Sequence, residues 1–150
     1  AAWNGPEPDR GIVLDCGEIS GYTIGNDVSS RSIEGANPLY LPQAKIYDRC
    51  CALGPCVTTD VTDPHDLEMS LTVDRDGTTV FEGRTTTSEM VRSCEELVSY
   101  LTRHNAIPDV SVLLTGTSIV PDEEFSLRVG DTVSAEIEGI GILRNPVTEV

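Results

Sequence analysis

Short runs in which apolar and polar residues alternate constrain the fold of this chain more than any other feature. The run LEMSLTVDRDGTTVFEG, residues 67–83, alternates on both sides of Asp76-Gly77. Successive side chains of a strand point to opposite faces of a sheet, and Asp-Gly is typical of a tight hairpin turn. This run therefore predicts a β-hairpin with one buried and one exposed face.

Further strands are expected along the chain. The apolar segments 11–14 and 110–114 each predict a strand, the second of them buried. Residues 124–129 and 132–137 predict a second hairpin around Gly130-Asp131, and residues 139–143 a last strand. The chain is thus predicted to be dominated by strands.

One main helix is expected, at about residues 93–104. Ser93 can cap its first turn while Glu96 closes a capping box. Cys94, Leu97, Val98 and Leu101 follow at i, i+3, i+4 and i+7, which places them on one apolar face. Together with the strands, this helix predicts an α+β, mainly β fold, and 150 residues suffice for a single domain with its own core.

The stretch from Gly21 to Val57 carries the chemistry. A strand that begins near Tyr22 breaks at Asn26-Asp27, so Asp27 lies where a strand ends. Arg31, Lys45 and Asp48 follow, separated by Gly and Pro turns that can fold the charged groups toward one another. Charged side chains grouped in this way indicate a functional site rather than part of the hydrophobic core.

A pair of carboxylates lies just upstream. Glu7 and Asp9 are spaced i, i+2, so in an extended chain they point to the same side, and a hairpin can bring Asp27 back to them. Three converging carboxylates require a cation, and oxygen ligands suit Mg²⁺ or Mn²⁺ rather than zinc. The alternative reading is that acidic residues are abundant here, so that such pairs occur without a metal.

The excess of acidic residues indicates a protein adapted to high salt and argues against nucleic acid and anionic membranes as partners. The chain has 25 Asp plus Glu against 10 Lys plus Arg, a formal net charge of −15. This charge repels nucleic acid and anionic membranes, so neither is an expected partner. Lys45 is the only lysine, and the other basic residues are arginines. A dispersed acid excess with almost no lysine is typical of halophilic proteins, in which salt screens the self-repulsion.

The cysteines and the hydropathy pattern predict a soluble, cytoplasmic protein. The odd number of cysteines, 5, favours free thiols in a reducing compartment. The cluster Cys50, Cys51 and Cys56 lacks the spacing of a zinc site, so we interpret the cysteines as small apolar fillers. No apolar run approaches the ~18 residues of a membrane span, and the first ten residues lack the pattern of a signal peptide.

Several segments together resemble the fumarylacetoacetate hydrolase family, and within it the branch of 2-keto-3-deoxy sugar acid dehydratases. These segments are GYTIGNDVSSRSIEG, NPLYLPQAK, LGP, LLTGTSIVP and VGDTVSAEIEGIGILRNPV, and they cover most of the chain in order. The resemblance implies a mixed β-sandwich roll of the family's C-terminal domain with short helical turns. It also implies a homodimer or higher homo-oligomer, and a longer enzyme whose acid/base residue lies upstream of this catalytic domain.

The resemblance assigns roles residue by residue. It implies that Glu7, Asp9 and Asp27 bind the metal, Mg²⁺ or alternatively Mn²⁺ or Ca²⁺, with Asp9 standing where the family commonly has Glu. It further implies that Arg31 and Lys45 take part in catalysis and substrate binding. Gly116 and Thr117, in the TGT motif, are implied to contact the substrate carboxylate.

The implied activity is dehydration of a 2-keto-3-deoxy sugar acid through a metal-stabilised enolate. The same ligands serve alternatives: hydrolysis of the C–C bond of a fumarylacetoacetate or acylpyruvate-type diketo acid, or hydration of a 2-keto-pentenoate. A second alternative is not an enzyme: in it the chain is a catalytically silent module that binds metal or forms dimers.

The charge pattern yields a first prediction. Raising KCl from low to molar concentration should raise the melting temperature by several degrees, because the Debye length falls to about 3 Å at 1 M and the acidic surface no longer repels itself. Thermal unfolding followed by circular dichroism measures this, with NaCl of equal ionic strength as the control. A flat or falling dependence would contradict a halophilic origin.

Overall fold

The computed structural model describes residues 3–149, which form two four-stranded sheets. Sheet I has the order β5-β3-β2-β8, and its strands are β2 (Pro8–Asp15), β3 (Glu18–Asp27), β5 (Cys51–Thr58) and β8 (Val110–Leu114). Sheet II has the order β10-β9-β6-β7, and its strands are β6 (Glu68–Arg75), β7 (Thr78–Thr86), β9 (Thr132–Ile137) and β10 (Gly141–Pro146). A short pair, β1 (Asn4–Gly5) and β4 (Ser29–Ser30), lies beside them.

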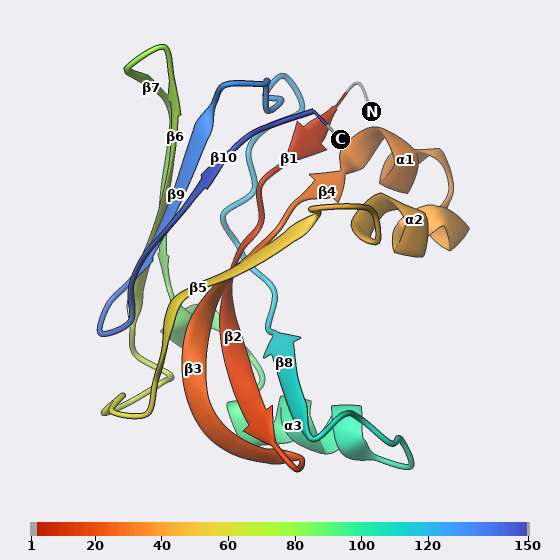
Figure 1. Cartoon of the computed structure of the whole chain (residues 1–150), viewed down its shortest axis with the longest axis vertical. Coiled ribbons are helices and arrows are strands. Elements are labelled where there is room, and N and C mark those ends of the chain that lie inside the picture. The colour runs from red at the N-terminus through yellow and green to blue at the C-terminus, as the bar shows by residue number, and fades with distance from the viewer. Residues whose placement is uncertain (1–2, 150) are drawn as a thin grey trace.

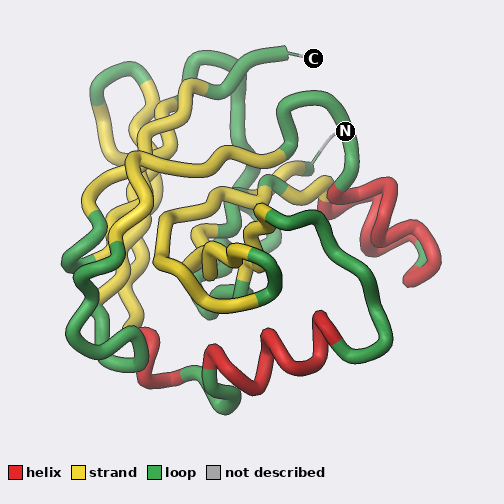
Figure 2. The backbone as a smooth tube through the Cα atoms, turned by 60° about the horizontal axis from the view of Figure 1, so that its bottom comes forward, coloured by secondary structure: helices red, strands yellow, loops and turns green. Residues whose placement is uncertain are grey.

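The two sheets form two layers, with the helices at the margins (Figure 1). Sheet II stands on one side, α3 (Cys94–Thr102) lies across the far end of sheet I, and α1 (Arg31–Ala36) and α2 (Leu41–Lys45) project at the other end. The tube in Figure 2 shows α3 running along one margin, apart from α1 and α2. Short 3₁₀ turns, η1 (Pro38–Tyr40) and η2 (Thr87–Glu89), complete the helical parts.

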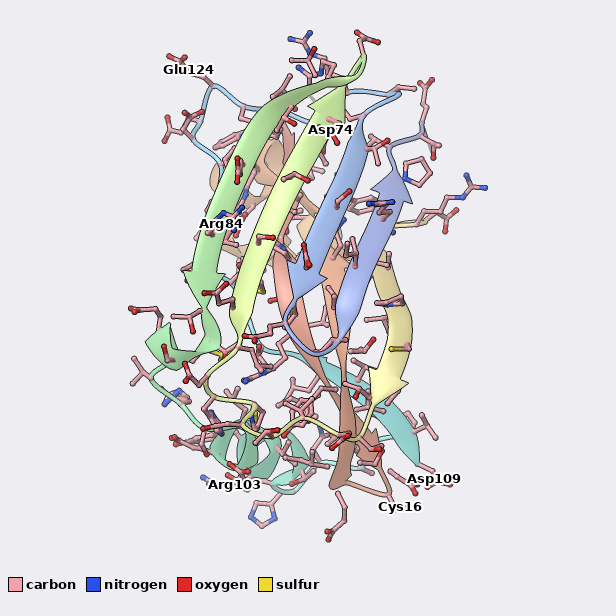
Figure 3. The ribbon with its side chains drawn as sticks, turned by 90° about the vertical axis from the view of Figure 1, so that its left-hand side faces the viewer. Cys16, Asp74, Arg84, Arg103, Asp109 and Glu124 are labelled. Carbon is pink, nitrogen blue, oxygen red and sulfur yellow. The ribbon has the colours of Figure 1, made fainter. Side chains whose placement is uncertain are left out.

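The apolar residues of the alternating runs form the core between the two sheets. On β6 the alternate residues Met69, Leu71 and Val73 are buried, and they pack with Ile24 of β3. The other face of sheet II carries polar side chains such as that of Arg84, which point away from the core (Figure 3). A smaller cluster joins Ile12 and Leu14 of β2 to Cys94 and Val98 of α3. The mainly β fold is therefore confirmed.

The expected hairpin turn and the N-cap of the main helix are confirmed, while the helix ends at Thr102 rather than near residue 104. Asp76 and Gly77 both have positive φ, 51° and 76°, as the two central residues of a tight hairpin turn require. Ser93 is the N-cap of α3, and its hydroxyl accepts a hydrogen bond from the backbone N–H of Glu96 at 3.1 Å.

The expected second hairpin is wrong. Residues 124–129 form no strand, and β9 pairs instead with β10. The reason lies in Asp131, which is 1% exposed and acts as an anchor rather than a turn residue. Its carboxylate accepts two hydrogen bonds from Arg75, both at 2.8 Å, and one from the backbone N–H of Arg128, also at 2.8 Å. This network folds the segment before β9 back on itself.

Three smaller expectations also need correction. Segment 110–114 is an edge strand rather than a buried one, and Val110 is 72% exposed. Each strand pairing observed between residues 4 and 146 is antiparallel, whereas a mixed arrangement was expected. Cys94 is buried as an apolar filler, but Cys16, Cys51 and Cys56 are exposed, because they lie in a turn and on the edge strand β5.

In residues 3–149 no helix has the length and apolar character to cross a membrane.

Asp131 yields a stability prediction. Asp131→Asn should lower the melting temperature by roughly 5 to 10 °C at pH 7, because it leaves the Arg75 guanidinium without its carboxylate partner. Hydrogen bonds from Arg75 hold the pKa of Asp131 below its ordinary value, so the stability it contributes is present above that value and is lost as pH falls. The difference between the two proteins should therefore shrink below about pH 4. Thermal unfolding at several pH values measures it, and an equal difference at pH 3 and pH 7 would contradict the assignment.

Candidate metal centre

The pairing of β2 with β3 brings the predicted carboxylates together. The two strands are antiparallel, so the start of β2 lies against the end of β3, with Asp9 opposite Gly25. The backbone N–H of Asp27 donates to the carbonyl oxygen of Glu7 at 2.9 Å, which makes these two residues direct neighbours across the strands. Glu7 and Asp9 share a face because they are two residues apart in an extended chain.

Lys45 closes this group from the end of α2. Its Nζ donates to Glu7 Oε2 at 2.6 Å, to Asp27 Oδ2 at 2.8 Å and to Ser29 Oγ at 2.7 Å. An ammonium has three donors, so all three are used. The preceding Ala44 is completely buried, which fixes α2 against the body of the protein. Lys45 thus bridges the carboxylates of Glu7 and Asp27.

Arg31 holds the other oxygen of Glu7. Its Nη2 lies 2.6 Å from Glu7 Oε1, and its Nη1 lies 3.0 Å from Glu34 Oε2. Glu7 therefore has a cation on each oxygen, which fixes the orientation of its carboxylate. In this geometry Arg31 positions Glu7, because its two ion pairs are with the side chains of Glu7 and Glu34.

Asp9 is the buried member of the group. Its side chain is 3% exposed, and its Oδ1 has no hydrogen-bond partner among the described residues. Burial, together with the neighbouring charges of Glu7 and Asp27, raises the pKa of Asp9 to about 7, although Lys45 and the N–H of Gly116 act in the other direction. Near neutral pH this carboxyl therefore needs either a proton or a nearby cation.

Gly116 and Thr117 follow β8, which pairs with β2 on the side away from β3. Gly116 has φ of 84°, and its backbone N–H lies close enough to the carboxylate of Asp9 to act against the rise in its pKa. Thr117 Oγ1 accepts from the backbone N–H of Ile119 at 3.1 Å, so its hydroxyl proton stays available to an acceptor. The structure thus brings Gly116 into the carboxylate group and leaves Thr117 beside it.

The donor set fits a hard divalent cation. It consists of carboxylate oxygens from Glu7, Asp9 and Asp27, and one of them, Asp9 Oδ1, is buried without a partner. In the geometry described for residues 3–149, no three acidic, Cys or His side chains already stand together as a metal cage, and the Lys45 ammonium takes the oxygens of Glu7 and Asp27. A bound cation would have to share these oxygens with Lys45 or displace it.

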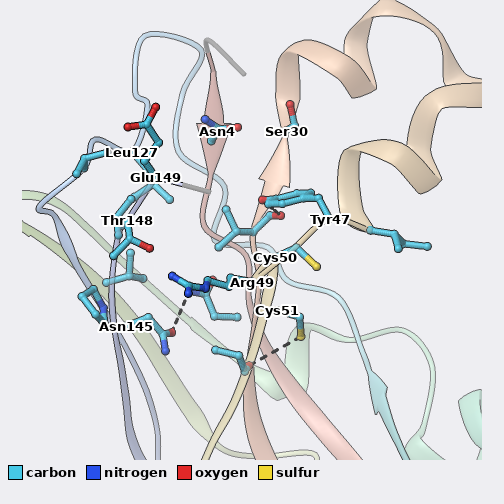
Figure 4. Close-up of a pocket in the computed structure, with 18 of the residues that line it drawn as sticks. Asn4, Ser30, Tyr47, Arg49, Cys50, Cys51, Leu127, Asn145, Thr148 and Glu149 are labelled. Atoms are coloured by element: carbon cyan, nitrogen blue, oxygen red, sulfur yellow. Dashed lines mark hydrogen bonds between the residues drawn. The ribbon is translucent and has the colours of Figure 1, made fainter.

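A cavity of about 1110 Å³ does not include these carboxylates. It lies between the β4–β5 segment and the C-terminal residues after β10, and Figure 4 shows Tyr47, Arg49 and Asn145 around it. Asn26 and Val28 line it, so Asp27 between them points the other way. We place the candidate centre at the carboxylates, because the charged oxygens of Glu7, Asp9 and Asp27 converge there.

Two residues of the centre were missed in the sequence. Ser29 is completely buried and accepts a hydrogen bond from Lys45, and Glu34 holds Arg31 from α1. The spacing carried a signal for Ser29, which lies two residues after Asp27 and so on the same side of an extended chain. For Glu34 the signal was its i, i+3 position relative to Arg31 on a helix.

Sequence comparison assigns the chain to one family. Residues 17–148 match the family described as "Fumarylacetoacetate (FAA) hydrolase C-terminal". The chain belongs to this family, and the resemblance seen in its motifs is confirmed.

Particular relatives narrow the comparison. The chain is 66% identical over 150 residues to a "Probable 2-keto-3-deoxyxylonate dehydratase" of Haloferax volcanii, covering 99% of this chain and 52% of the relative. It is 47% identical over 148 residues to a "2-dehydro-3-deoxy-D-arabinonate dehydratase" of Saccharolobus solfataricus, covering 97% and 50%. A solved structure described as "2-keto-3-deoxy-D-arabinonate dehydratase complexed with magnesium and 2,5-dioxopentanoate" matches with a TM-score of 0.97 and 46% identity, covering 100% of this chain and 54% of that one. The chain thus spans about half the length of these relatives.

The centre yields a binding prediction. Asp27→Ala should abolish measurable Mg²⁺ binding, because the two remaining carboxylates leave a hard cation with too few charged ligands. Isothermal titration calorimetry with MgCl₂ measures this. Asp48→Ala, which removes an equal charge from an exposed residue, is the control and should bind Mg²⁺ as the unmodified protein does. Unchanged affinity in Asp27→Ala would place the metal elsewhere.

Proposed function

We propose that this chain is the catalytic domain of a metal-dependent dehydratase that acts on 2-keto-3-deoxy sugar acids. The observation that carries the proposal is the convergence of Glu7, Asp9 and Asp27 with Lys45 at the joined ends of β2 and β3. The names of the relatives at 66% and 47% identity support this substrate class. The matching solved structure is complexed with magnesium, which supports Mg²⁺ as the cation.

The substrate class fits the groups around the carboxylates. A 2-keto acid presents a carboxylate and an adjacent carbonyl oxygen. Bound Mg²⁺ would polarise the carbonyl as a Lewis acid and balance the negative charge of the enolate. Gly116, in its left-handed conformation, and the free hydroxyl proton of Thr117 lie beside the centre and suit the substrate carboxylate.

Lys45 acts in this proposal as a donor to the C2 oxygen. Burial lowers its pKa, but the hydrogen bonds to Asp27 and Glu7 raise it, and the net direction is upward. While it holds these two carboxylates, the group is therefore an ammonium and acts as a donor. It can stabilise the charge that develops on the C2 oxygen when the C3 proton is removed. The C4 hydroxyl then leaves as water with the proton taken from C3, which gives a 2-keto-3-ene from a pentonate. Transfer of a proton from C5 to C3 turns this product into the enol of the C5 aldehyde, whose keto form is 2,5-dioxopentanoate.

Substrate assays separate this proposal from its alternatives. The protein should convert 2-keto-3-deoxy-arabinonate or 2-keto-3-deoxy-xylonate to 2,5-dioxopentanoate with Mg²⁺, and this conversion should stop with EDTA. Fumarylpyruvate tests the hydrolase and a 2-keto-pentenoate the hydratase. Cleavage of fumarylpyruvate alone would overturn the dehydratase, and turnover of none of these would favour a silent module. Because the chain spans about half of its relatives, the longest native form of the protein should be assayed.

A homodimer or higher homo-oligomer in the cytoplasm is part of the proposal. Exposed apolar side chains lie on and just after the η1–α2 segment and on β5, and they support an interface that another copy of the protein covers. They are Leu39, Tyr40, Leu41, Ile46, Leu53 and Val57. The five cysteines are all free thiols, which supports a reducing compartment. Analytical ultracentrifugation tests the oligomer.

Lys45 yields the catalytic prediction. Lys45→Arg should lower kcat by about two to four orders of magnitude, because the planar guanidinium cannot place one compact donor on the C2 oxygen. Mg²⁺ affinity and the melting temperature should stay within a narrow range of the unmodified protein, since the positive charge remains. Steady-state kinetics and calorimetry measure both. Near-normal kcat in Lys45→Arg would show that charge alone is needed at this position.

A further inference from the structure

Ser29 is the uncharged partner of the Lys45 ammonium. The acceptors of Lys45 Nζ are a carboxylate oxygen of Glu7, a carboxylate oxygen of Asp27 and the hydroxyl oxygen of Ser29, which lies 2.7 Å away. Glu7 and Asp27 also belong to the candidate metal centre, whereas Ser29 carries no charge. Of these three contacts, the one with Ser29 is therefore the one that does not use a carboxylate.

The hydroxyl of Ser29 is oriented to accept. It has a single proton, which it donates to the backbone carbonyl oxygen of Asp27 at 3.3 Å. Its lone pairs are then left for Lys45 Nζ, which has only protons to offer. Ser29 thus accepts from Lys45 while its own proton is engaged elsewhere.

Backbone pairing and burial hold Ser29 in place. It lies on β4 and pairs with Gly5 of β1, and its side chain is completely buried. On the other side of the contact, Lys45 ends α2 directly after the completely buried Ala44. The position of the Ser29 hydroxyl is therefore independent of how the charges of the centre are balanced.

A cation on the carboxylates would weaken the other two contacts of Lys45. A divalent cation draws on the negative charge of Glu7 and Asp27, which also holds the ammonium, and it repels the ammonium directly. Ser29 has no charge to share with the cation, and its completely buried hydroxyl offers the cation no open surface. The contact with Ser29 thus depends least on whether the centre is occupied.

We propose that Ser29 is a positioning residue that keeps Lys45 Nζ at the centre when Mg²⁺ occupies the carboxylates. Lys45 then stays where it donates to the C2 oxygen of the substrate, and this part of the inference rests on the proposed function. Ser29 acts only through Lys45 and touches neither substrate nor cation. A donor misplaced by about 1 Å can lower a rate about 10²-fold, so one hydroxyl can have a large effect.

Ser30 provides a matched control. It follows Ser29 on β4, is 3% exposed, and its hydroxyl has no hydrogen-bond partner among residues 3–149. Consecutive residues of a strand point to opposite sides, and Ser30 lines the cavity of about 1110 Å³ that excludes the carboxylates (Figure 4). Ser30→Ala therefore removes the same buried group as Ser29→Ala without removing a contact of Lys45.

NMR of the Lys45 side chain tests the contact without reference to turnover. Lys45 is the only lysine of the chain, so ¹³C-labelled lysine gives one Cε signal, and Lys45→Arg verifies its assignment. A fixed side chain shows different shifts for its two Hε protons, whereas a mobile one shows a single averaged shift. The unmodified protein and Ser30→Ala should keep separate Hε shifts with and without MgCl₂. Ser29→Ala should keep them without Mg²⁺ and lose them at saturating MgCl₂.

Two NMR results would overturn this role. Separate Hε shifts in Mg²⁺-saturated Ser29→Ala would show that the carboxylates suffice to hold Lys45. A single averaged shift in the Mg²⁺-saturated unmodified protein would show that Ser29 does not hold it. Calorimetry on the same samples verifies saturation, and if the unmodified protein binds no Mg²⁺, the candidate centre and the role of Ser29 are both wrong.

Steady-state kinetics with 2-keto-3-deoxy-arabinonate and Mg²⁺ tests the consequence for catalysis. Ser29→Ala should lower kcat about 10- to 100-fold, as expected when a residue that orients a functional group is removed. KM should stay within about twofold, because the donor acts on charge that develops in the transition state. Ser30→Ala should keep both constants.

The kinetic result separates positioning from packing. Equal losses of kcat in Ser29→Ala and Ser30→Ala would show that only the packing of buried hydroxyl groups matters, which overturns the proposal. If the unmodified protein turns over none of the substrates, the dehydratase is wrong and the NMR result decides the role of Ser29 by itself. Ser29→Cys keeps the volume but weakens the acceptor, and it replaces Ser29→Ala if circular dichroism shows that Ser29→Ala does not fold.

Discussion

Repulsion among three carboxylates is the constraint on which the rest of this structure depends. Glu7, Asp9 and Asp27 lie at the meeting point of two strands, and one of them is buried. Lys45 and Arg31 balance part of this charge, and each comes from a short helix in the segment between β4 and β5. That segment, which is too short for a stable isolated helix, is held in place by the charges it neutralises. The carboxylate cluster and the local fold thus stabilise each other.

The parts of the structure that the sequence predicted are those governed by local rules. The Asp76-Gly77 hairpin and the Ser93 cap follow from turn chemistry and capping within a few residues, and both are confirmed. The grouping of Glu7 with Asp27 needed only the two-residue period of a strand and one hairpin. The role of the fumarylacetoacetate hydrolase motifs was to select among the many acidic pairs of an acid-rich chain.

What the sequence did not reveal depends on contacts between distant residues. Gly130-Asp131 reads as a hairpin turn, but the Asp131 carboxylate is buried by Arg75, which lies 56 positions earlier. Likewise, nothing near Arg10 in the sequence shows that its guanidinium is enclosed by Pro64 and Met90. Such long-range partners override local patterns because burial of a charge costs more than a turn preference gains.

The alternation of Asp9 and Arg10 on β2 has a consequence for how this strand can change in evolution. Consecutive residues face opposite sides, so a one-residue slip of β2 against β3, caused by a change of length at the start of the strand, would turn the carboxylate toward the enclosed interior and the guanidinium toward the other acids. Both charges would then meet the wrong surroundings at once. Length changes at the start of β2 should therefore be tolerated only in steps of two residues, and point substitutions should be the main route of variation there.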